Sequence, residues 1–234
     1  TNAGSVFSAS NTNQLRSLPA ATVTAYEQIF LAGYYSLGDG GGGWYWVDTD
    51  DTTTADDGGA VFVVDGIRLK AIFEDELPAK RWGARDGYAY DSAPHIQKAI
   101  DYGHRILGGT VTLPAGEWKI MDTIFLKTRV SLKGLGTEFL DGGTSAVFAE
   151  PNIPVNAGGT NTYRRGGNTV LILGPGVNKP MVDFNPANAL VRIVGGTIDG
   201  ESVTKYQYSS TIEGIVFHGN GDNQTRYDCH PIRC

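Results

Sequence analysis

The stretch from Arg81 to Gly116 constrains the fold more than any other part of this 234-residue chain. It begins with a glycine-punctuated loop, RWGARDGYAYD, and ends with the short run GGTVTLPAG. Between them, Ile96, Ala99 and Ile100 are spaced i, i+3 and i+4, which predicts a helix with one buried face from about Ser92 to Tyr102. A single helix placed ahead of a run of short glycine-ended strands is the order expected for a plug on the open end of a β-solenoid.

The ends of this helical segment carry residues that commonly start and stop helices. Asp91 and Ser92 are candidate N-caps, because short polar side chains accept hydrogen bonds from the first free N–H groups. Pro94 falls in the first turn, where its missing N–H costs least, and Gly108 with Gly109 ends the segment. Capping explains the position of Asp91 more simply than a catalytic role does.

After the helix, the apolar pattern changes to an alternation of every second residue, which is typical of β-strands. Many of the alternating segments end in glycine, at intervals of 18, 40, 21 and 24 residues from Gly116 to Gly219. Because 40 is about two steps of 20, the intervals predict a coiled stack of strands with one layer per period. The side chains expected to face inward are those of Val111, Leu113, Trp118, Ile120, Ile124, Leu126, Val130, Leu132, Val170, Ile172, Val191, Ile193, Ile215 and Phe217.

Composition supports a mainly β fold, because glycine is abundant at 32 residues and charged residues make up only 19%. We interpret residues 1–13 as an N-terminal extension and 14–78 as a small aromatic and glycine-rich β subdomain. Residues 79–108 then form the loop and capping helix. Residues 109–234 are interpreted as the first coils of a right-handed parallel β-helix that continues beyond the chain end.

Two features of this division bear on binding. The insertion from Asp141 to Asn168 is rich in Gly, Asn, Thr and Pro, so we expect it to project from the stack as a loop. The aromatic residues of the subdomain, Trp44 to Trp46 among them, suggest either a sugar-stacking platform or a core. Aromatic residues in short strands are mostly core residues, which favours the second interpretation.

Charge and cysteine content exclude several classes of protein. The formal net charge is −6 and the isoelectric point is about 5.2, without a clustered basic run, so no nucleic-acid partner is expected. No stretch approaches the ~20 apolar residues of a membrane span, so no membrane association is expected. Cys229, His230 and Cys234 are too few ligands for a tetrahedral zinc site, and we expect neither a metal nor another cofactor.

The motifs described so far resemble a known family. The Arg81–Gly116 stretch, together with VSLKGLG at 130–136, looks like the start of the right-handed parallel β-helix of the pectate-lyase-like superfamily. The segment FLAGYYSLGDGGGG at 30–43, with WVD at 46–48 and DDGG at 56–59, resembles the small domain ahead of that helix in bacteriophage tailspikes. The resemblance covers roughly Gln14 to Gly219, and its motifs are more specific for the fold than for the function.

The resemblance implies a homotrimeric protein of the virion tail that contacts other tail or baseplate proteins. The full-length protein would bind, and in many members cleave, a bacterial capsule or O-antigen polysaccharide, so this chain would be its N-terminal portion. We expect that portion alone to be structural and inactive, with the depolymerase chemistry, hydrolase or lyase, on later coils or between subunits. Two alternatives stay open: a non-catalytic virion fibre or adaptor, and a secreted bacterial polysaccharide lyase of the pectate-lyase-like kind.

Candidate site residues come from the later strands. Glycoside hydrolysis needs two carboxylates about 5 Å or about 6.5–9.5 Å apart, and the candidates are Asp199, Glu201 and Glu213. Asp199 precedes a glycine and is also an ordinary turn residue. Arg192 and His218 alternate away from the inward side chains, so both are candidates for substrate binding, as are outward polar residues of any solvated sheet.

Overall fold

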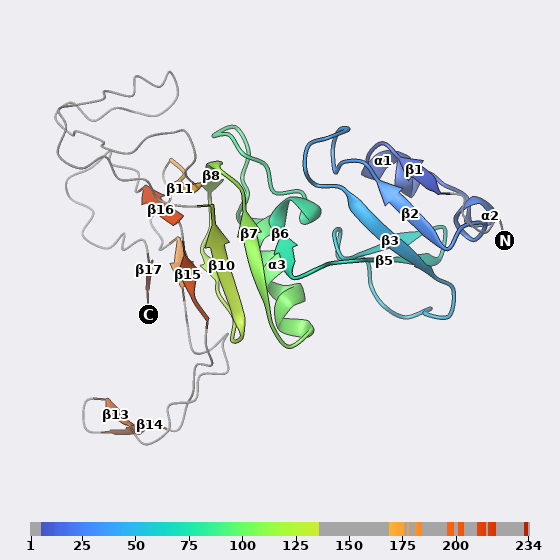
Figure 1. Cartoon of the computed structure of the whole chain (residues 1–234). Helices are drawn as coiled ribbons and strands as arrows, with labels where there is room; N and C mark the ends of the chain where they lie inside the picture. The colour runs from blue at the N-terminus through green and yellow to red at the C-terminus, as the bar shows by residue number, and fades with distance from the viewer. Residues whose placement is uncertain are drawn as a thin grey trace.

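The computed structural model describes residues 6–135 without a gap, and then 169–175, 177, 181–183, 196–198, 201–203, 210–213, 215–218 and 232–233. The described chain is mainly β, with few helices. Figure 1 shows a small sheet domain at one end of an elongated molecule and a group of parallel strands at the other, with helix α3 between the strands and the small domain. Within these ranges, no helix combines the length and apolar character needed to cross a bilayer.

The N-terminal domain is a five-stranded sheet in the order β1-β2-β3-β5-β4. Strand β1 pairs parallel with β2, and the remaining pairs are antiparallel. Because β1 is a strand of this sheet, residues 7–9 are not part of an extension, and the sheet begins earlier than the sequence indicated. Its elements are β1 (Phe7–Ala9), α1 (Thr12–Arg16), α2 (Ala20–Val23), β2 (Gln28–Leu31), β3 (Gly43–Asp48), β4 (Val61–Val64) and β5 (Ile67–Ala71).

One face of this sheet forms a core and the other face is open. Ile29, Tyr45 and Leu69 are fully buried on the first face, where Leu15 of α1 joins them. Since side chains alternate along a strand, Trp44 and Trp46 point to the opposite face and are 40% and 41% exposed. The expectation that these aromatic residues are core residues is therefore correct for Tyr45 and wrong for the two tryptophans.

A short connector joins the small sheet to the parallel strands. Strand β6 (Glu76–Pro78) pairs parallel with β7 (Gly109–Leu113), so it belongs to the parallel strands rather than to the small domain assigned to 14–78. A 3₁₀ helix, η1 (Ala79–Trp82), follows β6 directly. Its Arg81 donates hydrogen bonds back to the carbonyl oxygens of Gly42 (3.0 Å) and Trp44 (3.2 Å), which ties the connector to the small sheet.

Helix α3 (Ala93–Arg105) confirms the helix predicted from the sequence and extends three residues beyond it. Asp91 acts as the cap, since its Oδ1 accepts from the N–H of Ala93 and also from that of Met121, each at 3.1 Å. Ser92 makes no capping bond; its hydroxyl instead donates to the carbonyl oxygen of Arg85 at 2.7 Å. The polar residues before the helix therefore also fix the preceding loop.

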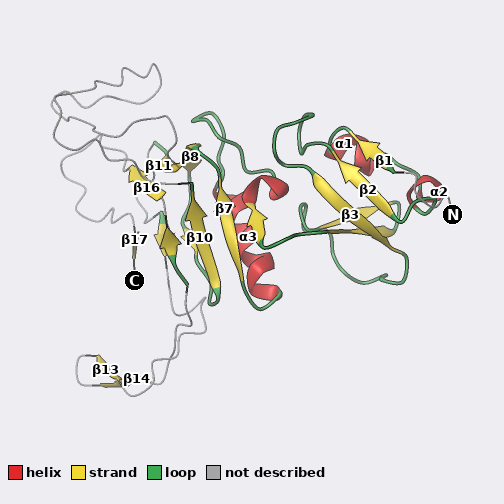
Figure 2. Ribbon diagram, in the orientation of Figure 1, coloured by secondary structure: helices red, strands yellow, loops and turns green. Residues whose placement is uncertain are grey.

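The remaining strands form three parallel sheets that the chain visits in turn. The sheet orders are β15-β10-β7-β6, β16-β11-β8 and β17-β12-β9, so each successive group of three strands adds one strand to every sheet. Figure 2 shows β7 and β10, neighbours in the first of these sheets, side by side. A separate antiparallel pair, β13 (Gly196–Ile198) and β14 (Glu201–Val203), lies between the second and third groups in the sequence. The parallel strands are β8 (Gly116–Ile120), β9 (Ile124–Phe125), β10 (Val130–Gly134), β11 (Thr169–Leu173), β12 (Val182–Asp183), β15 (Ile212–Glu213), β16 (Ile215–His218) and β17 (Ile232–Arg233), with β7 as given above.

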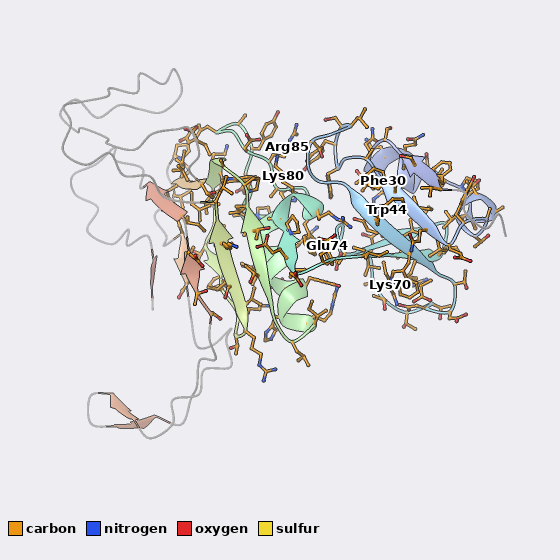
Figure 3. All side chains as sticks on the ribbon, viewed as in Figure 1. Phe30, Trp44, Lys70, Glu74, Lys80 and Arg85 are labelled. Carbon is orange, nitrogen blue, oxygen red and sulfur yellow. The ribbon has the colours of Figure 1, made fainter. Side chains whose placement is uncertain are left out.

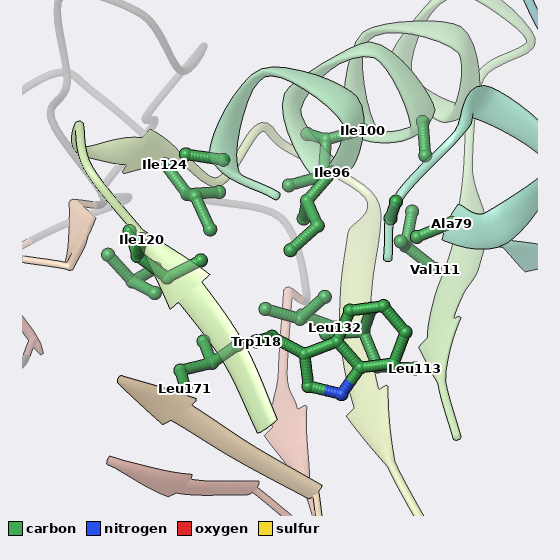
Figure 4. Close-up of a cluster of buried hydrophobic side chains, with 14 of the residues drawn as sticks. Ala79, Ile96, Ile100, Val111, Leu113, Trp118, Ile120, Ile124, Leu132 and Leu171 are labelled. Atoms are coloured by element: carbon green, nitrogen blue, oxygen red, sulfur yellow. The ribbon is translucent and has the colours of Figure 1, made fainter. Parts of the chain in front are cut away.

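The interior between these sheets holds the predicted inward residues of the first strands. Ile96 and Ile100 of α3 pack there against side chains from several strands, so the helix covers the beginning of the stack (Figure 4). All eight inward residues predicted between Val111 and Leu132 are buried, and so is Ile215. Val191 and Ile193 lie outside the described residues, as does the side chain of Phe217.

Strand β11 corrects the prediction at Val170 and Ile172. The register pairs Leu171 with Trp118, which faces inward, and pairs Val170 and Ile172 with the outward residues of β8. Val170 and Ile172 are nevertheless 2% exposed, because Tyr88 from the loop before α3 packs against them from outside. A strand that is buried on both faces has a continuous run of apolar residues in its sequence. Such a run does not show which side chains face the interior of the stack.

Candidate functional site

A hollow lies between the glycine-rich loop of the small domain and the outer face of the sheet β15-β10-β7-β6. Its volume is about 540 Å³. Three strands and the glycine-rich loop line it, so residues far apart in the sequence meet there. The lining residues are Gly38, Asp39, Gly40, Glu76, Pro78, Lys80, Thr112, Leu113, Pro114, Lys133, Gly134 and Leu135.

The strand register sets the chemistry of this outer face. Pro78, Thr112, Lys133 and Glu213 stand side by side on successive strands, because each is paired with the next in register. Glu213 is therefore the one sequence-predicted candidate whose described side chain lies on this face, and it is exposed. In this row Lys133 stands between Glu213 of β15 and Thr112 of β7.

Lys133 is held in its charged form. Its Nζ is 3.0 Å from Oε1 of Glu76, and this hydrogen bond, with the added attraction of Glu76 and Glu213, raises the pKa of Lys133. A base in a lyase must be deprotonated near neutral pH, which requires a lowered lysine pKa. Lys133 is therefore suited to hold an anionic group and not to abstract a proton.

The two carboxylates of this face come from strands that are not neighbours. Glu76 is on β6 and Glu213 is on β15, so three strand-to-strand spacings, or ~14 Å, separate their backbones. The side chain of Glu76 nevertheless reaches Nζ of Lys133, which is paired with Glu213 on the next strand. Both carboxylates therefore act on the same lysine.

The structure describes only some of the other candidate residues predicted from the sequence. Asp199 and Arg192 lie outside the described residues. Glu201 is in β14, and His218 is in β16 opposite Ile172, but their side chains are not described. Within the described ranges, no three His, Cys, Asp or Glu side chains gather as metal ligands. The proposed carboxylate set of Asp199, Glu201 and Glu213 therefore stays a prediction.

Asp39 organises the loop that forms one wall of the hollow. Its carboxylate accepts four backbone hydrogen bonds, from Tyr34, Tyr35, Ser36 and Gly41, at 2.7–3.0 Å. Burial alone would raise the pKa of Asp39, but these four donors outweigh it and lower the pKa below its ordinary value. The carboxylate is fully used in shaping the loop, so it is not available to a ligand.

Two further hollows flank the first, and sequence reasoning did not anticipate either. One, of about 180 Å³, is lined by Arg85 together with Tyr35, Tyr90 and Lys80. The other, of about 510 Å³, is lined by the exposed Trp44 and Ile72 and by the acidic run Glu74, Asp75 and Glu76. The acidic run and the aromatic-rich RWGARDGYAY segment were visible in the sequence, but their neighbours come from distant segments.

Comparison with known proteins matches both halves of this architecture. A family model for the phage tail protein small four-stranded β-sheet domain matches residues 8–74, which span strands β2 to β5 and nearly all of β1. Among curated proteins, none matches this chain. Residues 8–74 thus match this family model by sequence, and in the structure they form most of the five-stranded N-terminal sheet.

Several solved tailspike structures share the fold of nearly the whole chain. A Pantoea stewartii glycan biofilm modifying enzyme with a tailspike-like parallel β-helix fold, WceF, superposes with a TM-score of 0.55 at 16% identity, over 93% of this chain and 26% of the enzyme. The tailspike of Acinetobacter phage vB_ApiP_P1 gives 0.54 at 14% identity, over 91% and 29%. Tailspike gp49 of the Acinetobacter baumannii phage Fri1, a capsular polysaccharide depolymerase, gives 0.51 at 21% identity, over 91% and 38%.

These likenesses confirm the resemblance to tailspikes that the sequence motifs indicated. At such identities they establish the fold and not the chemistry. The chain spans only 26% to 38% of the length of these three structures. What the chain shares with them is a fold in which a small sheet domain is followed by parallel β strands.

Proposed function

We propose that this chain is the N-terminal portion of a bacteriophage tailspike or tail-fibre protein located in the virion tail. The observation that carries this proposal is the order of the two parts: a phage tail small β-sheet domain leads directly into three parallel sheets visited in turn. In this role the small domain holds the β strands to the rest of the tail and contacts other tail or baseplate proteins.

The complete protein, in this proposal, binds and depolymerises a bacterial capsule or O-antigen polysaccharide. Support comes from the gp49 tailspike, which is a capsular polysaccharide depolymerase, and from WceF, which modifies a biofilm glycan. The chain itself has a structural and assembly role. In favour of this division, Glu213, the one candidate carboxylate whose side chain is described, lies beside Lys133, whose pKa is raised and not lowered.

The finer architecture follows from the same proposal. The three sheets are the sides of a right-handed parallel β-helix, α3 is its N-terminal cap, and further coils complete the stack. The assembled protein is a homotrimer. The parallel pairing of every strand between β6 and β17 outside the β13–β14 hairpin supports the solenoid, and α3 covering its first strands supports the cap.

A polysaccharide-degradation assay tests whether this chain is structural while the complete protein depolymerises the polysaccharide. The 234-residue chain is incubated with purified capsule or O-antigen polysaccharide of candidate host strains, and polymer length is followed by size-exclusion chromatography. We expect no shortening with this chain, and shortening with a longer natural form that includes it. Shortening by the 234-residue chain that is abolished by Asp199→Ala or Glu213→Ala would refute the structural role.

The same assay separates the second candidate function, a non-catalytic fibre or adaptor. The exposed aromatic face of the small sheet favours it, because Trp44 and Trp46 provide a binding surface there. Binding of the longer form to polysaccharide without any change in polymer length would select this function over depolymerisation. No feature of the described structure favours a secreted lyase.

A further inference from the structure

Arg81 is a buried cation for which the described part of the chain provides no counter-ion. Its side chain belongs to a residue that is only 6% exposed, and the guanidinium lies 4.7 Å and 5.1 Å from the ring centroids of Tyr45 and Phe73. Among the described residues no carboxylate pairs with it, and its Nε donates no hydrogen bond. Buried charges are normally paired, because leaving water without a partner is costly. The guanidinium therefore points to a partner from outside the chain.

Arg81 borders the 510 Å³ hollow, together with Gly42 and Gly43. Its two terminal nitrogens donate to the carbonyl oxygens of Gly42 and Trp44, and each nitrogen keeps a second hydrogen. A Cβ atom on Gly43 would overlap Nη1 of Arg81, so a glycine is required for the guanidinium to lie here. Because residues 42 and 43 carry no side chains, they leave the free donors of Arg81 next to the hollow.

The other walls of this hollow are apolar and acidic. Trp44 is 40% exposed, and Phe30 supports its ring from the neighbouring strand, with the ring centroids 5.0 Å apart. Glu74 and Asp75 are exposed, and in the described part of the chain neither forms an ion pair. Figure 3 shows Trp44 on the small sheet and Glu74 on the connector that leads from this sheet to the parallel strands. The volume falls within the range of about 300–1,000 Å³ that is typical of small-molecule sites.

The charges around the hollow select an uncharged ligand. Arg81 disfavours a cation, and Glu74 and Asp75 disfavour an anion. Glu76, the third carboxylate of the lining, is already paired with Lys133. A hydroxyl group can both accept from a guanidinium and donate to a carboxylate, so an uncharged polyol satisfies all of these groups.

The exposed indole narrows the choice among uncharged polyols. A pyranose ring carries C–H groups on one face and hydroxyl groups around its edge. The C–H face packs on the electron-rich face of an aromatic ring, as Trp44 provides, while the hydroxyl groups reach the polar side chains. A neutral saccharide therefore matches the indole, the guanidinium and the carboxylates together.

We propose that this hollow binds a neutral saccharide. Trp44 stacks on the sugar ring, Arg81 donates to hydroxyl oxygens, and Glu74 and Asp75 accept from hydroxyl groups. All lining residues lie between Gly42 and Arg81, so the site belongs to the small sheet, the connector and η1. It is therefore separate from any depolymerase site on later coils, and the inference does not depend on depolymerisation by the complete protein.

Ligand-observed saturation-transfer NMR tests this site in the 234-residue chain. The neutral probes are lactose, maltotriose and N,N′-diacetylchitobiose, and trigalacturonate is the anionic counterpart. We expect saturation transfer to at least one neutral probe and weaker transfer to trigalacturonate. Trp44→Ala should raise the Kd of the bound probe by about tenfold, as for other central aromatic anchors. Tyr90→Ala removes an aromatic side chain of similar exposure from a different hollow and should leave the Kd unchanged.

Replacing the two rim carboxylates tests the selection by charge. Glu74→Gln/Asp75→Asn keeps the shape of both side chains and removes their repulsion of an anion. We expect trigalacturonate to bind this variant at least about fivefold more tightly than it binds the wild-type chain, because Arg81 remains. Asp50→Asn, at an exposed acidic position that does not line the hollow, should leave its binding unchanged.

Four results would overturn the inference. These are no saturation transfer to any neutral probe, an unchanged Kd in Trp44→Ala, tighter binding of trigalacturonate than of the neutral probes by the wild-type chain, and unchanged trigalacturonate binding in the double variant. Because the assay does not measure polymer shortening or location in the virion, each of these results would leave the proposed tailspike function intact.

Discussion

At the scale of single residues, carboxylates that accept backbone hydrogen bonds shape the loops of the small domain. Asp39 binds four N–H groups, and Asp57 binds those of Gly59, Ala60 and Val61 at 2.8–3.0 Å. Asp57 also pairs with Arg105 of α3, which links the small domain to the helix. These aspartates lie in glycine-rich turns of the kind that the sequence marks clearly.

Replacing Asp39 by Asn tests its role in the loop. The amide places a donor where Oδ2 now accepts from Tyr35 and Ser36, so two of the four hydrogen bonds are lost. We expect the free energy of unfolding to fall by about 1–2 kcal/mol, as for other hydrogen bonds to charged groups. Urea denaturation followed by circular dichroism measures the change, and Asp50→Asn, at an exposed position, should change little. Equal stability of both variants would contradict the role assigned to Asp39.

The lowered pKa values of these carboxylates also predict how stability depends on pH. The Lys70 hydrogen bond lowers the pKa of Asp48, and backbone donors lower that of Asp39 despite its burial. A carboxyl whose folded pKa lies below its unfolded value stabilises the fold above the unfolded pKa and loses this effect as pH falls through the folded pKa. The urea midpoint should therefore drop between about pH 5 and pH 2, and drop less in Asp39→Asn. A midpoint that rises on acidification would contradict the prediction.

At the scale of elements, helix α3 was the most predictable feature of the chain. The sequence predicted the helix from three local signals. These are the spacing of its apolar residues, the capping residue Asp91 and the glycine Gly108 after its end. Which side chains of β11 face inward could not be predicted from the sequence. Tyr88 packs on the outer side of the strand, and it is 82 residues before Val170 in the sequence. The local pattern of apolar residues in a strand carries no information about a side chain from a distant segment that packs on its outer face.

Truncation of Ile96 tests whether α3 is part of the core of the parallel strands. Ile96 is fully buried and packs in the same cluster as Ile120, Ile124 and Leu132 (Figure 4). We expect Ile96→Ala to lower the free energy of unfolding by about 2–5 kcal/mol. Lys98→Ala, on the exposed face of the same helix, should change it by less than about 0.5 kcal/mol. Similar effects of the two changes, measured by urea denaturation, would show that the helix is not a structural cap.

At the scale of the whole molecule, the sequence supported the order of the parts better than it supported the site. The alternation and the glycine intervals predicted a stack of strands, and the three parallel sheets confirm its mainly β character. The three hollows at the junction could not be predicted, because the glycine-rich loop, the acidic run before β6, the Arg85 loop and strand β10 meet only after folding. The candidates Asp199 and Arg192 stay predictions, since they lie outside the described residues.

The central claim, that this is a tail component of a virion, can be tested most directly by immunogold electron microscopy. Antibodies raised against the 234-residue chain would be applied to purified phage particles whose genome encodes it, with particles lacking the gene as the control. We predict gold particles at the tail, at the end that contacts the host, and none on the control. Label confined to the capsid, or protein found only free in the culture medium, would contradict the assignment.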